Sequence, residues 1–468
     1  MVKNYRHMGK QNGLAKDISR VLSANLIVAI VGFLGSFIFP KILTIESYAL
    51  YHTFTLYVGY IAITHLGFPS GMMINYAGQK YEDIDTKQYK AELNILFSIL
   101  AGFTSAFLVI AAIAQSRMIF YVGAITFPVG IINSYKALLQ SWGRFKFFSR
   151  LSSIQAAVIP LAALAYYIVK GDLPGDIYII IYIIINWILA LYIVIEMIGR
   201  VRGVKRAAIR SAKNWETEKT GAAVLIGNYI NVLFTSADKQ FVSWFFSTAQ
   251  FAYYSFGMSM QSLMTVFITS IAQPLFPAMA RGQFKDDEYD RVKEVLLIFG
   301  SFSGCAYFAA SFIVKHFIQK YIPSLDVVGI YFVVFPVMAV INCLFVNLYK
   351  IKNLMSEYVI TLAAILGVAV ALNALFVFIY PAYYGVAIAT VITYYIWYFI
   401  GMRQFRFIHV RISDLLYLSI YTIGFFMITK INNDILGFIA AFIFVIALSA
   451  IFYRRDINYI MQLVRRKR

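Results

Sequence analysis

The chain has 468 residues, of which 61% are apolar and only 13% are charged, and its mean hydropathy is +0.73. Soluble globular proteins carry about 25% charged residues, so this composition excludes a single soluble domain, a disordered chain and a disulfide-rich scaffold. The net charge of +19 is spread between long uncharged runs instead of forming one basic polar domain, which argues against nucleic-acid binding. The composition therefore predicts a membrane protein.

The N-terminus predicts a membrane span and not a cleavable signal peptide. Residues 1–20 are polar and basic, and the apolar run 21–39 is long enough to span a membrane and lacks a small-residue cleavage site. Cys305 and Cys343 both lie inside apolar runs, where cysteine is usually a small buried side chain. Their separation fits neither a metal site nor a disulfide framework, and we predict no metal and no cofactor.

Thirteen apolar runs lie between consecutive charges, and a span needs about 20 mostly apolar residues. The run 358–402 is too long for one helix, and Pro381 divides it into two, which gives fourteen predicted spans. The runs are 21–40, 47–79, 93–116, 118–135, 151–169, 177–195, 220–237, 240–280, 295–314, 327–349, 358–402, 415–429 and 435–453.

The charges between the spans predict the orientation. With the N-terminus inside, 33 of the 41 lysines and arginines fall in the even-numbered loops and at the two termini, and eight fall elsewhere. Cytoplasmic loops carry an excess of basic residues, so this asymmetry predicts an even number of spans with both termini cytoplasmic. Most of the net charge is thereby explained by topology, because anionic lipid on that face attracts basic segments.

Short motifs recur at a nearly constant spacing. The segment Thr44–Tyr51 parallels Ser247–Tyr254 at an offset of 203 residues. Phe127-Pro128-Val129 parallels Phe335-Pro336-Val337 at an offset of 208, and Phe68-Pro69 pairs with Phe276-Pro277 at the same offset. Because six spans separate the copies, the halves share one orientation, which is a parallel repeat about an axis along the membrane normal.

The predicted fold is therefore an all-α polytopic membrane protein of about fourteen transmembrane helices. Two parallel six-helix bundles surround a central cleft, and two further helices follow at the C-terminus. The predicted parts are an N-terminal bundle (1–199), a basic cytoplasmic linker (200–219), a C-terminal bundle (220–402) and the last two spans with a basic tail (403–468).

The repeat also predicts that two charged residues lie inside a membrane span. It places the outer turn near residues 248–250, so Asp238 and Lys239 fall inside span 7, with Lys239 about 12 Å below the helix end at 1.5 Å per residue. With Asn228, Asn231 and Thr235 they form a polar stripe on one helical face. Lipid cannot satisfy such a stripe, so we expect it to face protein or a hydrated cavity.

Other spans carry single polar residues. Lys41 with Asn25 in span 1, Lys136 in span 4, and His52 and His65 in span 2 are candidates for a lining of the cleft. Simpler explanations stay open: the lysines could snorkel to the interface, and the histidines could be hydrogen-bonded packing residues. The inward charges are mainly basic, with Asp238 nearly alone among the acids, which predicts an anionic substrate; lysine suits phosphate.

Several segments of the chain match a known family of transporters. The matching residues are Phe39-Pro40-Lys41-Ile42-Leu43, Glu46-Ser47-Tyr48, His65-Leu66-Gly67-Phe68-Pro69-Ser70-Gly71, and Ala237-Asp238-Lys239 followed by Phe251-Ala252-Tyr253-Tyr254. Through them the chain resembles the Wzx polysaccharide (O-antigen) flippases of the multidrug/oligosaccharidyl-lipid/polysaccharide exporter superfamily. The resemblance extends to length, span count and repeat plan, although Ala49 and Ala252 replace a usual glycine.

The resemblance implies a transporter and not an enzyme. Such proteins move undecaprenyl-pyrophosphate-linked oligosaccharides to the outer leaflet of the bacterial cytoplasmic membrane by alternating access, driven by an ion gradient. By this resemblance, Lys41, Lys136 and Lys239 would attract the pyrophosphate, and three asparagines would bind sugar hydroxyls or phosphate. Asp238, with His52 and His65, would carry the coupling ion, a proton or sodium. The asparagines are Asn25, Asn228 and Asn231.

Three alternatives remain open at this stage. A lipid II or teichuronic flippase and a drug or cation antiporter belong to the same superfamily. Buried acidic residues would favour the antiporter. A membrane glycan polymerase or acyltransferase would need a larger outer loop, whereas the longest predicted polar one is about residues 170–176. The expected partners are the lipid-linked oligosaccharide, membrane lipid, a coupling ion and other glycan-assembly membrane proteins, with no nucleic acid.

Overall fold

The computed structural model describes residues 30–204, 212–281, 286–409 and 411–454. Every regular element in those residues is helical, as the apolar runs predict. Eleven of the described helices are long and apolar enough to cross a membrane, and the shorter Ile30–Ile42 and Ile412–Ile428 are apolar as well. Each of the fourteen predicted spans corresponds to one helix or one broken helical segment in the described residues, which confirms the predicted fold class.

The chain divides into two compact units, residues 1–233 and 234–468. The boundary falls inside one continuous helix, α8, so α8 contributes its first part to one unit and its last part to the other.

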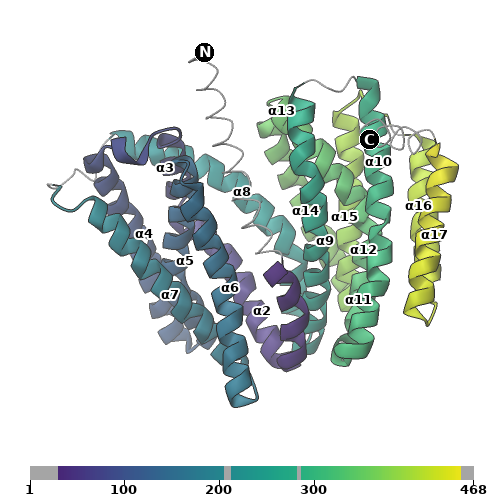
Figure 1. Ribbon diagram of the computed structural model, residues 1–468, viewed down its shortest axis with the longest axis horizontal. Coiled ribbons are helices and arrows are strands. Elements are labelled where there is room, and N and C mark those ends of the chain that lie inside the picture. The colour runs from purple at the N-terminus through teal and green to yellow at the C-terminus, as the bar shows by residue number, and fades with distance from the viewer. Residues whose placement is uncertain (1–29, 205–211, 282–285, 410, 455–468) are drawn as a thin grey trace, which may run out of the picture. The chain divides into compact units, whose positions relative to one another are not determined.

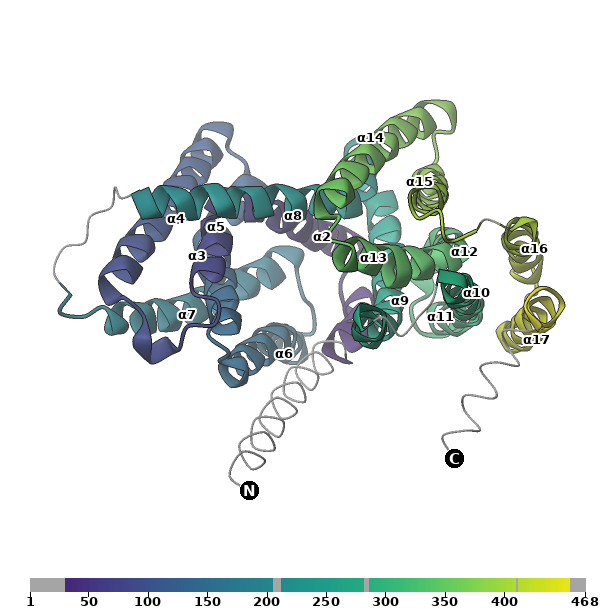
Figure 2. The same cartoon turned by 90° about the horizontal axis from the view of Figure 1, so that it is seen from above.

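The N-terminal unit is built around α5. It packs against α2, α3, α4, α6 and α7 (Figures 1 and 2). Much of the length of α5 is buried. The bounds in this unit are Ile30–Ile42, α2 Ile45–Tyr60, η1 Ile61–His65, α3 Phe68–Asn75, η2 Tyr81–Asp83, α4 Thr86–Ala114, α5 Arg117–Ser141, α6 Phe145–Lys170, α7 Gly175–Arg200 and α8 Ala212–Phe245.

The C-terminal unit is built in the same way around α12, which packs against α9, α10, α11, α15 and α16. The final pair, α16 and α17, lies side by side in both views, and α17 also packs on α11 (Figures 1 and 2). The bounds are α9 Thr248–Ala280, α10 Asp286–Ser301, α11 Ser303–Phe317, η3 Gln319–Ser324, α12 Leu325–Val340, η4 Ile341–Phe345, α13 Val346–Ile351, α14 Met355–Ile379, α15 Tyr383–Gln404, α16 Ile412–Ile428 and α17 Asp434–Phe452.

The helix boundaries follow local signals in the sequence. The break around Pro381 ends α14 at Ile379 and lets α15 begin at Tyr383, as predicted. Thr44 caps the start of α2 by accepting from the Ser47 amide at 3.1 Å, and Ser247 caps α9 through a reciprocal capping box with Gln250. Thr44 and Ser247 occupy equivalent positions in the sequence repeat, so the repeated segment starts equivalent helices.

Proline positions repeat in the same way. Pro128 lies inside α5 and Pro336 inside α12, the central helix of each unit. A proline inside a helix cannot donate to the carbonyl four residues earlier. In α5 that carbonyl belongs to Ala124, and the Trp187 indole donates to it instead at 2.8 Å. The lost helical hydrogen bond is thus replaced by one that fastens α7 to α5.

The periphery of the protein is apolar and exposed. Ile113 and Val169, for example, are 79% and 78% exposed. Large exposed apolar surfaces mark contact with a partner or with lipid. Together with the eleven long apolar helices, this surface is that of a multi-pass membrane protein.

Candidate functional site

Asp238 is a buried acid of the C-terminal unit. It lies seven residues before the end of α8, and a turn follows at Phe246–Ser247, so the repeat correctly placed it in a helix and not in a loop. Its side chain is only 5% exposed. A buried charge must find hydrogen-bond partners, and those of Asp238 come from three other helices.

Three hydroxyl groups surround one carboxylate oxygen. Tyr254 of α9 donates to Asp238 Oδ2 at 3.0 Å, Tyr331 of α12 donates to the same atom, and Thr390 of α15 approaches it at 3.4 Å. The Tyr254 and Tyr331 hydroxyl oxygens are 2.7 Å apart. The other carboxylate oxygen, Oδ1, accepts from the Lys239 amide at 2.6 Å. Asp238 therefore joins α8, α9, α12 and α15.

The rest of the predicted stripe on α8 is more exposed. Asn228, Asn231 and Thr235 are exposed, and Lys239 is partly buried. The structure therefore separates the stripe into a buried acid held by tyrosines and an exposed row of amides on the preceding turns.

Lys136 is the centre of a second polar cluster, in the N-terminal unit. Its ammonium group donates to Gln155 Oε1 of α6 at 2.5 Å. Gln155 Nε2 donates to Asn186 Oδ1 of α7 at 2.8 Å, and Asn186 Nδ2 donates to the Tyr182 carbonyl at 2.8 Å. This chain of hydrogen bonds links α5, α6 and α7. Gln155 and Asn186 were not singled out from the sequence, although a buried amide within an apolar run is a detectable signal.

A pocket of about 470 Å³ opens beside this cluster. Its walls come from α2, α5, α6 and α7. The lining residues are Tyr51, Lys136, Ser152, Gln155, Ala156, Ile159, Pro160, Tyr178 and Tyr182.

The other predicted site residues that the structure describes do not join these two clusters. Asn25 lies outside the described residues. Lys41 is exposed near the end of the helix Ile30–Ile42. His52 packs on the Tyr48 ring, with centroids 4.2 Å apart, and His65 Nδ1 accepts from the Gly67 amide at 3.2 Å.

Lys293 is a base whose position the sequence analysis did not foresee. It was counted among the loop bases that set the topology, but its side chain is fully buried in α10. It donates to Asp414 Oδ2 of α16 at 2.6 Å and to the His409 carbonyl at 2.5 Å. Tyr453 donates to the other oxygen of Asp414 at 2.8 Å, which ties the end of α17 to the same cluster.

Buried acids are also more numerous than the sequence indicated, and the expectation that Asp238 is nearly alone was wrong. Glu92 of α4 is fully buried and accepts from the Tyr76 hydroxyl at 2.6 Å. Asp290 and Glu294 of α10 are buried beside Arg411, and Asp434 of α17 accepts from Lys315 at 2.8 Å. Helix packing brings these acids to bases and tyrosines far away in the sequence, which no single apolar run reveals.

Outside the spanning segments, Tyr81 lies against two guanidinium groups. The Arg144 guanidinium lies 4.3 Å from its ring centroid and the Arg200 guanidinium 4.7 Å. Its hydroxyl donates to Glu196 at 3.3 Å, and Arg144 pairs with the same carboxylate at 3.4 Å. Burial, followed by the nearby Glu196 charge, raises the pKa of Tyr81 above its usual value.

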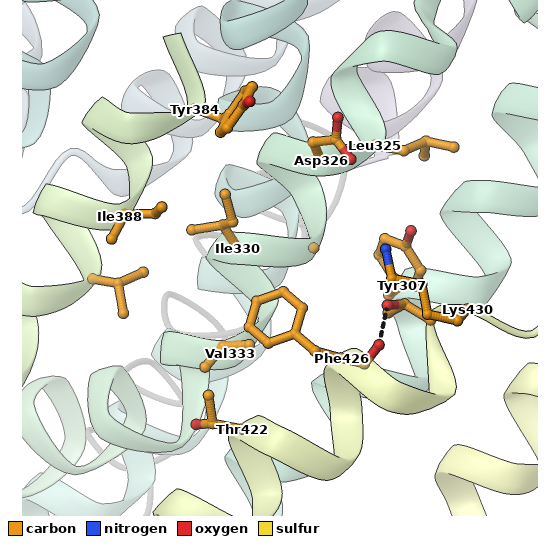
Figure 3. A pocket seen from close by; sticks show the side chains of 13 residues that line it. Tyr307, Leu325, Asp326, Ile330, Val333, Tyr384, Ile388, Thr422, Phe426 and Lys430 are labelled. Carbon is orange, nitrogen blue, oxygen red and sulfur yellow. Dashed lines mark hydrogen bonds between the residues drawn. The ribbon is translucent and has the colours of Figure 1, made fainter. Parts of the chain in front are cut away.

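A second pocket, of about 550 Å³, lies within the C-terminal unit between α11, α12, α15 and α16. Figure 3 shows Ile330, Val333, Ile388 and Phe426 along its walls, with Asp326 and Tyr384 in the upper part of the view. Most of its lining is apolar, so its chemistry differs from that of the pocket beside Lys136.

Comparison with known proteins identifies the family. A model of the family described as "Polysaccharide biosynthesis protein" matches residues 14–283, more than half of the chain. The chain belongs to the polysaccharide biosynthesis protein family. The match contains both polar clusters except for Tyr331 and Thr390, which lie beyond its end.

A solved structure supports the same architecture for this family member. The chain is similar to "Lipid II flippase MurJ, inward closed conformation", with a TM-score of 0.68 and 15% sequence identity. The alignment covers 93% of this chain and 99% of that one, so the two share a fold over nearly their full lengths. No curated protein matches the sequence significantly.

Proposed function

We propose that this protein is a flippase that carries undecaprenyl-pyrophosphate-linked oligosaccharide repeat units from the inner to the outer leaflet of the bacterial cytoplasmic membrane. The repeat units are those of O-antigen, capsule or exopolysaccharide. The observation that carries the proposal is membership of the polysaccharide biosynthesis protein family on a fold shared with a lipid II flippase structure. Alternating access of two bundles, with both termini cytoplasmic, would move the substrate.

Basic and amide side chains would bind the polar part of the substrate. Lys41, Lys136 and Lys239 would attract its anionic groups, since lysine acts as a point charge toward phosphate. Asn228 and Asn231 are exposed on α8, where an amide can reach a sugar hydroxyl or a phosphate oxygen. Asn25 would serve in the same way. The apolar pocket of the C-terminal unit offers surface of the kind that a polyprenyl chain would cover.

The geometry around Asp238 favours a proton over sodium as the coupling ion. Three oxygen atoms, one each from Asp238, Tyr254 and Tyr331, lie within hydrogen-bond reach of one another. The tyrosines supply two protons, so an ionised Asp238 leaves one of the three contacts without a hydrogen. A proton on Asp238 supplies the missing hydrogen. Loading and release of that proton would change the attachment of α8 to α9 and α12. We assign the coupling proton to Asp238, and His52 and His65 would be secondary candidates for ion coupling.

Three other functions have less support. A lipid II or teichuronic flippase would use the same machinery for a different glycan. A drug or cation antiporter would need carboxylates facing a cation, whereas Asp290, Glu294, Asp414 and Asp434 each lie within 4 Å of a basic side chain. The family and the fold are those of transporters, so they give no support to a glycan polymerase or an acyltransferase.

Deletion of the gene tests the function directly. We expect lipid-linked glycan to accumulate on the inner leaflet and surface glycan to be lost, both restored by the intact gene. Lys41→Ala and Lys239→Ala should each reduce restoration, and the double variant should reduce it further, while Lys170→Ala at the exposed end of α6 should not. Normal surface glycan in the deletion strain would refute the flippase proposal.

The coupling ion is tested in vesicles. With the intact protein we expect glycan transport to depend on an imposed pH gradient. Asp238→Asn replaces the carboxyl group with a neutral amide that still forms hydrogen bonds but cannot carry the proton, so it should abolish that dependence. Transport by the intact protein that follows a sodium gradient at constant pH would contradict the assignment of a proton.

A further inference from the structure

Of four pockets in the described part of the chain, the one beside Lys136 has the most polar lining. Six of its nine lining residues carry a side-chain nitrogen or oxygen atom. By contrast, the pocket between α11 and α17 is lined by phenylalanine, isoleucine and alanine apart from Asp434. An acyl chain would leave the polar groups of the Lys136 pocket without partners, which costs free energy in a low-dielectric surrounding. The pocket therefore suits a polar ligand.

One wall of this pocket is a single face of α6. Ser152, Gln155, Ala156, Ile159 and Pro160 follow the three- and four-residue spacing of a helical stripe. They extend about 12 Å along the helix axis at 1.5 Å per residue. The serine hydroxyl and the glutamine amide give this wall both hydrogen-bond donors and acceptors. Hydroxyl-rich ligands need such mixed donors and acceptors.

The opposite wall is aromatic. Tyr51 of α2 and Tyr178 of α7 stack with ring centroids 4.3 Å apart and an interplanar angle of 19°. Tyr178 stacks in turn on Phe39, and Tyr182 packs edge-on against Phe54. These contacts fix the rings before any ligand arrives. Because Tyr178 is covered on one face by Tyr51 and on the other by Phe39, these side chains offer a sugar ring edges and hydroxyl groups more than free ring faces.

The charge in the pocket is a single cation. Within the described part of the chain, no carboxylate lies within ion-pair distance of Lys136, and its ammonium donates to Gln155 alone. An ammonium has three hydrogens, so two remain for a ligand. A partly buried charge without a counterion favours binding of an anion. One positive charge matches a monoanion better than the multiply charged pyrophosphate.

We propose that this pocket is a glycan subsite that binds a sugar ring bearing a carboxylate, with the carboxylate on Lys136 and the ring against the tyrosines. This inference rests on the proposed flippase function and deepens it by naming the class of sugar. It also assigns Lys136 to the saccharide and leaves the pyrophosphate to other cations.

Saturation-transfer NMR on the purified full chain in detergent tests the proposal. The probes are D-glucuronate, D-glucose and inorganic pyrophosphate. We expect ring-proton signals from glucuronate at concentrations where glucose gives weak ones. Lys136→Met keeps the length and removes the charge, and should weaken glucuronate binding about tenfold, as loss of a charge-assisted hydrogen bond would. Lys170→Met, at the exposed end of α6, is the matched control and should bind normally.

A second variant guards against misfolding at Lys136. Gln155→Glu keeps the lysine and adds a counterion beside it, so it should also suppress glucuronate binding while glucose binding is unchanged. Equal binding of glucose and glucuronate by the intact protein would overturn the proposal, and so would unchanged glucuronate binding in both variants. Displacement of glucuronate by equimolar pyrophosphate would overturn it in favour of a phosphate site. Failure of the gene-deletion test would leave these binding results intact, so the two proposals can fail separately.

Discussion

Tyr254 and Tyr331 place their hydroxyl oxygens 2.7 Å apart while both donate to the same carboxylate oxygen of Asp238. Both tyrosines are fully buried, so neither hydroxyl has water as a substitute partner. Tyr254→Phe and Tyr331→Phe should therefore each lower the free energy of unfolding by about 1–3 kcal/mol. SDS titration in mixed micelles measures this loss.

Tyr253→Phe provides the matched control for these substitutions. Tyr253 is the neighbour of Tyr254 and packs edge-on against Tyr321 with centroids 6.0 Å apart. Its phenyl ring would remain after the substitution, so stability should be unchanged. An equal loss of unfolding free energy in Tyr253→Phe, Tyr254→Phe and Tyr331→Phe would show that the hydrogen bonds from tyrosine to Asp238 make no special contribution to stability.

The buried pair of Lys293 and Asp414 predicts a strong and asymmetric effect. Removal of one partner leaves an uncompensated charge, so Lys293→Ala should cost roughly 3–5 kcal/mol of stability. The double variant Lys293→Met with Asp414→Asn removes both charges and should cost clearly less. The same SDS titration distinguishes the two outcomes, and equal losses for the single and double variants would contradict a buried ion pair.

The Trp187 indole predicts a coupling with Pro128. Trp187→Phe should cost about 1 kcal/mol, because the Ala124 carbonyl loses its donor while the stacking on Phe127 is kept. In a Pro128→Ala background residue 128 regains an amide hydrogen for that carbonyl, so the same tryptophan substitution should cost less. A double-mutant cycle measures the difference. Additive losses would mean that the indole does not replace the missing helical bond.

Gly221 of α8 meets the backbone of the turn before α3. A β-carbon at Gly221 would lie 2.1 Å from the Gly67 carbonyl oxygen, and Gly67 itself has a φ of +79°. Asn75 also donates to Thr217 at 2.5 Å, so α3 and the first part of α8 are in close contact. Gly221→Ala should separate them and lower the unfolding temperature. Gly199→Ala, where a β-carbon meets nothing within 4 Å, should not.

Much of the architecture follows from composition and spacing. Apolar runs predict spans because the hydrocarbon core demands them, and Pro381 divides α14 from α15 because a proline cannot continue the preceding helix. The repeat predicts that Lys239 lies inside a helix, since it transfers the outer turn of the first half to Ser247. These signals are local or periodic, so one sequence suffices to detect them.

The polar sites follow from the sequence only in part. Asp238 and Lys136 stand out as charges within apolar runs, but their partners Tyr331 and Gln155 lie 93 and 19 residues away and carry no distinguishing pattern. Lys293 shows the limit most clearly. A lysine near the end of a span has the same sequence signature whether it points to water or is buried against Asp414, and only the packing of α16 decides between the two.

Thr44 and Ser247 cap equivalent helices in the two halves of the chain, but the charged residues of the two halves differ. At their offset of 203 the position equivalent to Asp238 in the first half is Gly35, and at the offset of 208 the position equivalent to Lys136 in the second half is Leu344. Each half thus has only one of the two charged centres. On the two proposals above, a chimera of two N-terminal halves would keep the Lys136 pocket and lack Asp238, and a chimera of two C-terminal halves would keep Asp238 and lack that pocket. The halves share helix caps and proline positions but differ in their charged residues.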